Sequence, residues 1–264
     1  MPTLTEIYRY PVKSTWGELL PASDVGPMGL PFDRAWMVAD ESGRMITGRT
    51  EPRLVQIKVR VDDSTLTLSA PGREVLVVPR SQFNQPMPAS VWKDEFPAFA
   101  GAKPADEWLS GFLGKPVWLL YVGAASARRV RRRPEVALSF ADAYPLLLIG
   151  QGSLDELNRR VGRDLSMRRF RPNLVVTGSE AFAEDRWKKI RIGEVIFSIE
   201  KPCERCAFTT VDPETGEKSS DQEPLRTLAT FRRTPDGVLF GQNAVAEGAG
   251  QIALGMEVEI LEAV

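Results

Sequence analysis

Two cysteines carry the most reactive side chains of this sequence, and they lie close together. Cys203 and Cys206 stand three positions apart in the segment KPCERCAFTTVD, with Lys201 and Arg205 nearby. A thiolate is a nucleophile and a ligand for soft metals, and neighbouring cations stabilise the thiolate over the thiol. The 264 residues include no histidine, which excludes Ser-His-Asp triads, Cys-His pairs and two-histidine zinc sites.

Four interpretations of this pair follow from its spacing. A thioredoxin-like redox pair requires a helix that starts at the cysteines, whereas the following residues AFTTV have the pattern of a strand. A zinc site requires four ligands, and no other Cys or His is present to complete it. Two buried, inert thiols and a single thiolate that binds the metal of a cofactor both remain open.

The composition is that of an ordinary globular protein. Apolar residues make up 43%, charged residues 26%, and the net charge is −1, so nothing favours nucleic acid or an anionic membrane as a partner. No apolar run approaches the ~18 residues that span a bilayer, and the N-terminus lacks the pattern of a secretory signal. We expect a cytoplasmic, monomeric protein with reduced thiols.

The sequence lacks the motifs of a protein that draws electrons from a dinucleotide or an iron–sulfur cluster of its own. It has no GxGxxG segment and no GxxxxGK[ST] loop, and two cysteines are too few for a usual iron–sulfur cluster. Redox chemistry therefore needs a cofactor from outside and a separate electron donor.

The elements that must position these residues are mainly short strands. Helices are predicted over 105–114, over 153–162 with Ser153 as the cap, and over 223–233. Strands are predicted over 65–69, 117–122, 144–150, 173–178, 189–201, 207–212 and 255–263. This order predicts a β-rich α+β protein whose second half is a barrel rather than a doubly wound sheet.

A cluster of five arginines within 128–133 marks a change in composition, and 123–136 is predicted to be a linker or long loop. The cluster has two interpretations. It is either a solvated loop or a docking surface for an acidic electron-transfer partner, because complementary charge steers weak redox encounters.

Several motifs together resemble one protein family. PCERCAFTTVDPETGEK, EPLRTLATFRR and FGQN are similar to the C-terminal part of MOSC proteins. YPVKS, GLPFDRAWMVAD, TGRTEPRLV and RFRPNLVV are similar to the two-part members, a group that includes the mitochondrial amidoxime-reducing component and its bacterial relatives. The resemblance implies an N-terminal β-barrel-like domain over 1–122 and a MOSC β-barrel domain with short peripheral helices over 123–264.

The resemblance also implies an activity. It implies an oxidoreductase that uses molybdenum cofactor, without pyridoxal phosphate, to reduce N-hydroxylated compounds: amidoximes, hydroxylamines and N-hydroxylated bases. Electrons would come from a separate ferredoxin-type or cytochrome-type donor with its reductase. The alternative is a non-catalytic module that binds or carries molybdenum cofactor or sulfur.

Finally, the matched motifs imply the site residues. Cys206, the second cysteine, is the implied metal ligand and catalytic residue, and Cys203 receives no role. Molybdopterin bears a phosphate, which cations and polar groups bind. The implied cofactor-binding residues are Lys13, Ser14, Arg34, Asp142, Arg171, Asn173, Arg205 and Asn243. Because these come from both halves of the chain, we expect a cleft between the halves.

Overall fold

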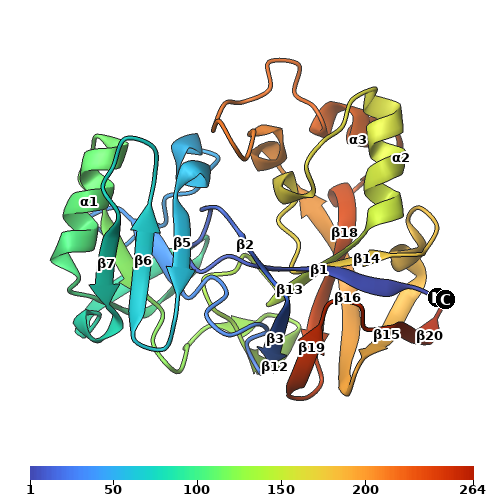
Figure 1. Ribbon diagram of the computed structural model, residues 1–264, viewed down its shortest axis with the longest axis horizontal. Helices are drawn as coiled ribbons and strands as arrows, with labels where there is room; N and C mark the ends of the chain where they lie inside the picture. Colours follow the sequence, from blue (N-terminus) through green and yellow to red (C-terminus); the bar gives the residue numbers. More distant parts are fainter.

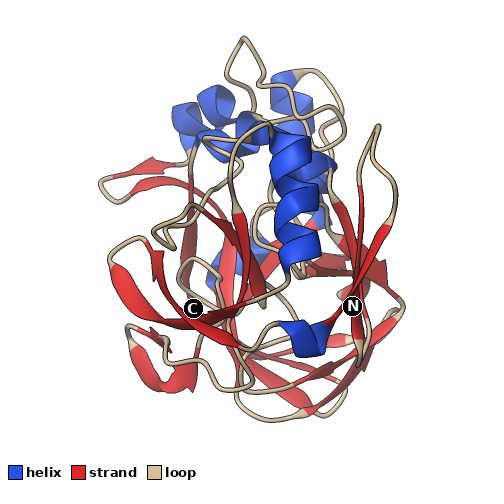
Figure 2. Ribbon diagram, turned by 90° about the vertical axis from the view of Figure 1, so that its left-hand side faces the viewer, coloured by secondary structure: helices blue, strands red, loops and turns tan.

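The computed structural model describes all 264 residues, which form two lobes side by side (Figure 1). Seen after a 90° turn, strands make up most of the molecule (Figure 2). None of the helices is long and apolar enough to cross a membrane. The predominance of strands confirms the predicted β-rich fold class.

The first lobe contains two sheets and one helix. A four-stranded sheet has the order β4-β10-β9-β8, and a three-stranded sheet has the order β5-β6-β7. The strands are β4 (Trp36–Ala39), β5 (Lys58–Val61), β6 (Thr65–Ser69), β7 (Leu76–Pro79), β8 (Gln85–Val91), β9 (Asp94–Ala100) and β10 (Trp118–Tyr121). Helix α1 (Lys103–Leu113) contacts β10 and β7. The 3-10 helices η1 (Pro52–Gln56) and η2 (Arg80–Gln82) complete the lobe.

The second lobe is built on a nine-stranded sheet with the order β2-β1-β14-β13-β18-β16-β15-β20, in which β17 also pairs with β18. Its strands are β1 (Thr3–Arg9), β2 (Glu18–Leu20), β13 (Leu146–Gly150), β14 (Leu174–Thr177), β15 (Trp187–Ile192), β16 (Val195–Arg205), β17 (Arg233–Thr234), β18 (Gly237–Ala246) and β20 (Val258–Ala263). The paired strands run from β2 to β20 and do not form a fully closed barrel. The ends of the path nevertheless meet, because an antiparallel bridge joins Thr3 of β1 to Glu257 beside β20, and Val258 N donates to Pro2 O at 2.8 Å.

Helices α2 (Gln151–Val161) and α3 (Leu225–Phe231) lie together at one end of this sheet (Figure 1). Two small pairs, β3 (Ala22–Val25) with β19 (Gly250–Ala253) and β11 (Arg129–Val130) with β12 (Arg133–Ala137), lie outside the main sheets. The remaining 3-10 helices are η3 (Met167–Arg169), η4 (Ala183–Arg186) and η5 (Ala207–Thr210).

The first strand of the chain pairs with a strand from the second half of the sequence. Strand β1 pairs antiparallel with β14, and Leu4 and Ile7 are fully buried in the same core as Leu148 and Phe197. Strand β3 likewise pairs with β19. The N-terminal strands therefore complete the core of the second lobe, and the division of the chain at residue 122 stays a prediction.

Four local predictions were wrong. The single strand predicted over 189–201 is a hairpin of two strands, β15 and β16, which turns at Gly193 and Glu194. Helix α2 starts at Gln151 after Gly150, because the Ser153 hydroxyl does not cap the helix but donates to Glu184 Oε1 at 2.7 Å. Residues 207–210 form η5 rather than a strand, since Thr209 donates through both N and Oγ1 to Cys206 O. Residues 129–137 form the β11–β12 hairpin rather than a linker.

Candidate active site

A cavity of about 560 Å³ opens where the two lobes meet. Its lining contains all nine site residues expected from the sequence: Lys13, Ser14, Arg34, Asp142, Arg171, Asn173, Arg205, Cys206 and Asn243. Contacts between the lobes frame it, because the Phe208 ring packs against Gly48 and Lys218 Nζ donates to Arg49 O at 2.9 Å. The structure thus gathers residues that lie far apart in the chain, whereas the role of each stays a prediction.

The lining is predominantly cationic. Seven Lys or Arg side chains and three Asp or Glu side chains contribute to it. Low-dielectric walls concentrate the potential of such a cluster and favour an anionic ligand.

Lys13 reaches the cavity from the turn after β1. Its side chain is 6% exposed, and Nζ donates to Phe140 O at 2.8 Å and to Asp142 Oδ1 at 2.7 Å. Burial lowers the pKa of Lys13, and Asp142 partly offsets this effect. Burial raises the pKa of Asp142, but the charge of Lys13 and hydrogen bonds from Lys13 and Trp92 outweigh it and lower the pKa to about 2. The Asp142 side chain is nevertheless 66% exposed, so solvent screens this pair.

Arg34 and Asn173 join the two lobes in the cavity wall. Arg34 Nη1 donates to Asn173 Oδ1 at 2.9 Å, Nη2 donates to Arg171 O at 3.1 Å, and the guanidinium pairs with the buried Asp33. The Asn173 amide also accepts from Leu147 N at 3.2 Å and donates to Tyr8 O at 3.1 Å. Asn173 is 1% exposed, so its amide holds the wall together.

The Arg171 guanidinium has hydrogen-bond donors that no protein group accepts. Its Nη1 donates to Thr15 O at 2.5 Å, whereas its buried Nη2 has no partner. Its guanidinium lies 4.1 Å from the Tyr10 ring centroid, and that of Arg34 lies 4.3 Å from the same ring. Burial lowers the pKa of Arg171 to about 10, so the side chain is still charged at neutral pH. A buried guanidinium N–H without a partner is costly, which suits a ligand that accepts hydrogen bonds.

Unusual backbone conformations concentrate around the cavity. Seven residues other than glycine have positive φ, and four of them line it: Ser14, Arg34, Trp92 and Arg171. Such conformations cost about 1–3 kcal/mol each and cluster at functional sites. Four of the seven gather at this one cavity, which supports its choice as the candidate functional site.

The two cysteines have different surroundings. Cys206 is exposed in the cavity at the start of η5, and Thr209 holds its backbone carbonyl. Cys203 is partly buried, and Arg205 Nη1 donates to its Sγ at 3.0 Å. The cation that the sequence assigned to the pair therefore contacts Cys203. Arg205 also donates to Phe170 O, and its buried Nε has no partner.

Asn243 lies on β18, where Nδ2 is 3.4 Å from Pro202 O, its one weak hydrogen bond. Sequence reasoning missed other lining residues, among them Thr47, Arg49, Trp92 and Phe208. Arg49 and Thr47 lie inside TGRTEPRLV, one of the motifs that carried the resemblance, which was a usable signal. No sequence pattern marks Trp92.

Comparisons with known proteins show the family of this chain. Residues 1–116 match the MOSC N-terminal beta barrel domain, and residues 135–259 match the MOSC domain. The chain is 34% identical over 280 residues to mitochondrial amidoxime-reducing component 1 of Mus musculus, covering 98% of this chain and 82% of the relative. The corresponding protein of Homo sapiens is 34% identical over 284 residues, covering 98% and 83%. That of Danio rerio is 36% identical over 244 residues, covering 88% and 75%. The chain combines a MOSC N-terminal domain with a MOSC domain and belongs to the family of the amidoxime-reducing components.

Proposed function

We propose that this protein is a molybdenum-cofactor-dependent reductase of N-hydroxylated compounds, namely amidoximes, hydroxylamines and N-hydroxylated bases. The observation that carries the proposal is one cavity of about 560 Å³ in which an exposed thiol, Cys206, faces a wall of cations from both lobes. The relatives named amidoxime-reducing components support the substrate class.

The donor set fits molybdopterin. Its phosphate requires several hydrogen-bond donors and positive charge, and the wall offers the partnerless Arg171 Nη2 and Arg205 Nε beside Lys13 and Arg34. Cys206 would supply the one thiolate that binds the metal, a soft ligand for a metal held by sulfur. Ser14 would add its hydroxyl and backbone amide, and Asn173 would fix Arg34.

The bound cofactor would supply two-electron chemistry that the protein itself lacks. Reduction of R–NHOH takes two electrons and two protons, breaks the N–O bond, and gives R–NH2 and water. The chain would bind the cofactor, orient the substrate and receive a separate donor of the ferredoxin or cytochrome type with its reductase. A monomer in the cytoplasm remains the expectation from the sequence.

The decisive experiment is the reduction of benzamidoxime to benzamidine by cofactor-loaded protein. We expect turnover with a reduced viologen dye or a complete donor chain, no turnover with NADH alone, and no turnover by Cys206→Ala. Protein that binds cofactor in a 1:1 ratio but reduces no N-hydroxylated compound would instead be the carrier module that the sequence left as the alternative.

A further inference from the structure

Trp92 is an unusual residue for the place that it occupies. It lies in the two-residue turn that joins β8 to β9, where Val91 pairs with Asp94, and its φ is 57°. This left-handed conformation is favourable for Gly or Asn and is an outlier for a bulky side chain. The residue is 52% exposed. A large aromatic side chain is therefore kept in solvent at a position where a smaller residue would be more stable.

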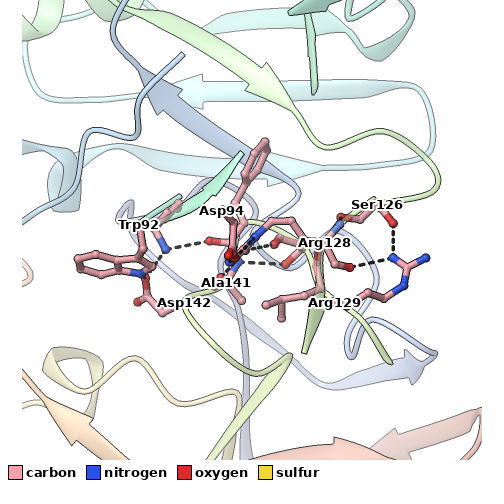
Figure 3. A network of polar contacts seen from close by, with 11 residues as sticks. Trp92, Asp94, Ser126, Arg128, Arg129, Ala141 and Asp142 are labelled. Atoms are coloured by element: carbon pink, nitrogen blue, oxygen red, sulfur yellow. Dashed lines mark hydrogen bonds and ion pairs between the residues drawn. The ribbon is translucent and has the colours of Figure 1, made fainter. Parts of the chain in front are cut away.

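The indole faces the cavity and is held in place there. Its Nε1 donates to Asp142 Oδ1 at 2.9 Å, and the same oxygen accepts from Lys13 Nζ at 2.7 Å. The Arg49 guanidinium lies 4.2 Å from the ring centroid, a distance typical of a cation–π contact. Figure 3 shows Trp92 beside Asp142 at one end of a continuous polar network.

Arg128 braces both partners of this contact. Its guanidinium donates to Ser139 O at 2.5 Å, to Ala141 O at 2.7 Å and to Asp94 Oδ2 at 2.9 Å, and the side chain is 1% exposed. Asp94 follows the Trp92 turn, and Ala141 precedes Asp142. The network thereby fixes the turn against the 139–142 segment (Figure 3), so the indole has little freedom to collapse onto the protein surface.

Trp92 is also the most accessible apolar surface in the cavity. Eight large apolar residues of the chain are exposed, and Trp92 alone among them lines the cavity. The neighbouring aromatic residues Tyr144 and Phe170 are 8% and 1% exposed. Phe208 is a further aromatic residue of the lining and is partly buried. Trp92 therefore offers a ligand the most open flat apolar surface in this cavity.

We propose that Trp92 is the substrate-selecting residue of this cavity, and that it stacks on the flat aromatic group of aryl N-hydroxylated substrates. The proposal rests on the proposed function and names the preferred substrate class of the same site. An aromatic ring gains contact area and favourable ring geometry against an indole, which a small aliphatic group cannot match. Aryl amidoximes should therefore bind better than aliphatic amidoximes of the same head group.

Two variants separate the ring from its hydrogen bond. Trp92→Phe keeps an aromatic face but cannot donate to Asp142, whereas Trp92→Gln loses the face but keeps an amide donor. Both are compared with wild type at equal molybdenum content. The first measurement is calorimetric binding of the products benzamidine and acetamidine, which requires no turnover. The second is the ratio of kcat/KM for benzamidoxime to that for acetamidoxime.

We expect Trp92→Gln to weaken benzamidine binding and to lower the kcat/KM ratio about tenfold, which corresponds to about 1.4 kcal/mol. Trp92→Phe should stay within about threefold of wild type, and acetamidine binding should not change in either variant. Equal losses for both ligands, equal losses in both variants, or wild type that does not prefer benzamidine would overturn the role of Trp92. Failure of the proposed function would give a different result, because wild type would then reduce neither amidoxime. The calorimetric binding of benzamidine and acetamidine would still test the role of the indole.

Discussion

Lys13 and Asp142 form an ion pair across 129 positions of sequence, with Nζ 2.7 Å from Oδ1. The lysine follows the first strand of the chain, and the aspartate precedes β13 of the large sheet. The pair therefore ties the start of the chain to the second half exactly where the cavity opens. Its lysine is buried while its carboxylate is exposed, so the carboxylate lies on the solvent side of the pair.

Removal of either of two distant cations should release the cofactor. We expect Lys13→Ala and Arg171→Ala each to lower the molybdenum content of purified protein about tenfold or more, because a charge-assisted hydrogen bond contributes about 1.5–3 kcal/mol. Metal analysis by mass spectrometry measures the content, and circular dichroism verifies that the variants are folded. Arg60→Ala, an exposed arginine on β5 outside the cavity, is the matched control and should retain full content. Normal content in both cavity variants would contradict the shared-cleft arrangement.

The two cysteines should differ in their sensitivity to substitution. Cys206 is exposed in the cavity, whereas the Cys203 sulfur is partly buried and already accepts a hydrogen bond from Arg205. Cys206→Ala should therefore fold but lose its molybdenum and its reductase activity, and Cys203→Ala should keep most of both. Metal content and turnover of the two purified variants provide the measurement. If Cys203→Ala proves the more damaging substitution, the ligand assignment is wrong.

The arginine cluster divides into structural and exposed members. Arg128 is buried in the network of Figure 3, so the solvated-loop and docking interpretations both fail for this residue. Arg131 and Arg132 are exposed at the turn of the β11–β12 hairpin. Arg133 Nη1 pairs with Glu200 Oε1 at 2.6 Å. Glu200 precedes Lys201, which lines the cavity, so the hairpin lies near the cavity.

If an acidic electron donor docks on this hairpin, Arg131→Glu with Arg132→Glu should raise the KM for the donor about tenfold at low salt. High salt should reduce the difference, because it screens exposed charges. Turnover with a small reduced dye should not change. The control pair Arg60→Glu with Lys188→Glu changes the same charge at exposed positions outside the cavity. If both pairs of substitutions raise the KM for the donor equally, the hairpin is not the docking site and its exposed arginines are ordinary surface charges.

Asp106 gives a pH dependence of stability that is independent of the cavity. Burial raises the pKa of Asp106 from 3.8 to about 6. The hydrogen bond that its carboxylate accepts from Leu119 N lowers the pKa and offsets only part of this effect. The native state therefore binds this proton more tightly than the unfolded state, and the contribution to stability falls as pH rises from about 4 to about 6. At pH 7 the ionised carboxylate costs stability.

Asp106→Asn should remove this cost and still accept from Leu119 N. We expect its Tm to exceed that of wild type by about 2–4 °C at pH 7 and to equal it near pH 4. Asp106→Ala, which cannot accept the hydrogen bond, should be less stable than Asp106→Asn at both pH values. Calorimetric unfolding at the two pH values makes the comparison, and an identical pH profile for wild type and Asp106→Asn would disprove the raised pKa.

The sequence by itself determined the family and nine of the residues that line the cavity. Short motifs such as YPVKS and RFRPN keep their functional side chains adjacent in the chain, so Lys13, Ser14, Arg171 and Asn173 could be named without coordinates. Helices were predicted well for a similar reason. The pattern of Trp108, Leu109 and Leu113 in α1 depends on the periodicity of the helix itself, and these residues are buried in the structure.

Tertiary structure decided the features whose partners are distant in sequence. Arg128 looks like a surface charge in a run of arginines, but its bonding partners come from Asp94 and from residues 139–141. Trp92 occupies a turn that no local pattern marks, and only the fold places it against Asp142. Strand β1 belongs to the second lobe because β14 supplies its hydrogen-bond partners some 170 residues later. Strand pairing and burial of charge depend on groups that meet only when the chain has folded, which is why local sequence could not specify them.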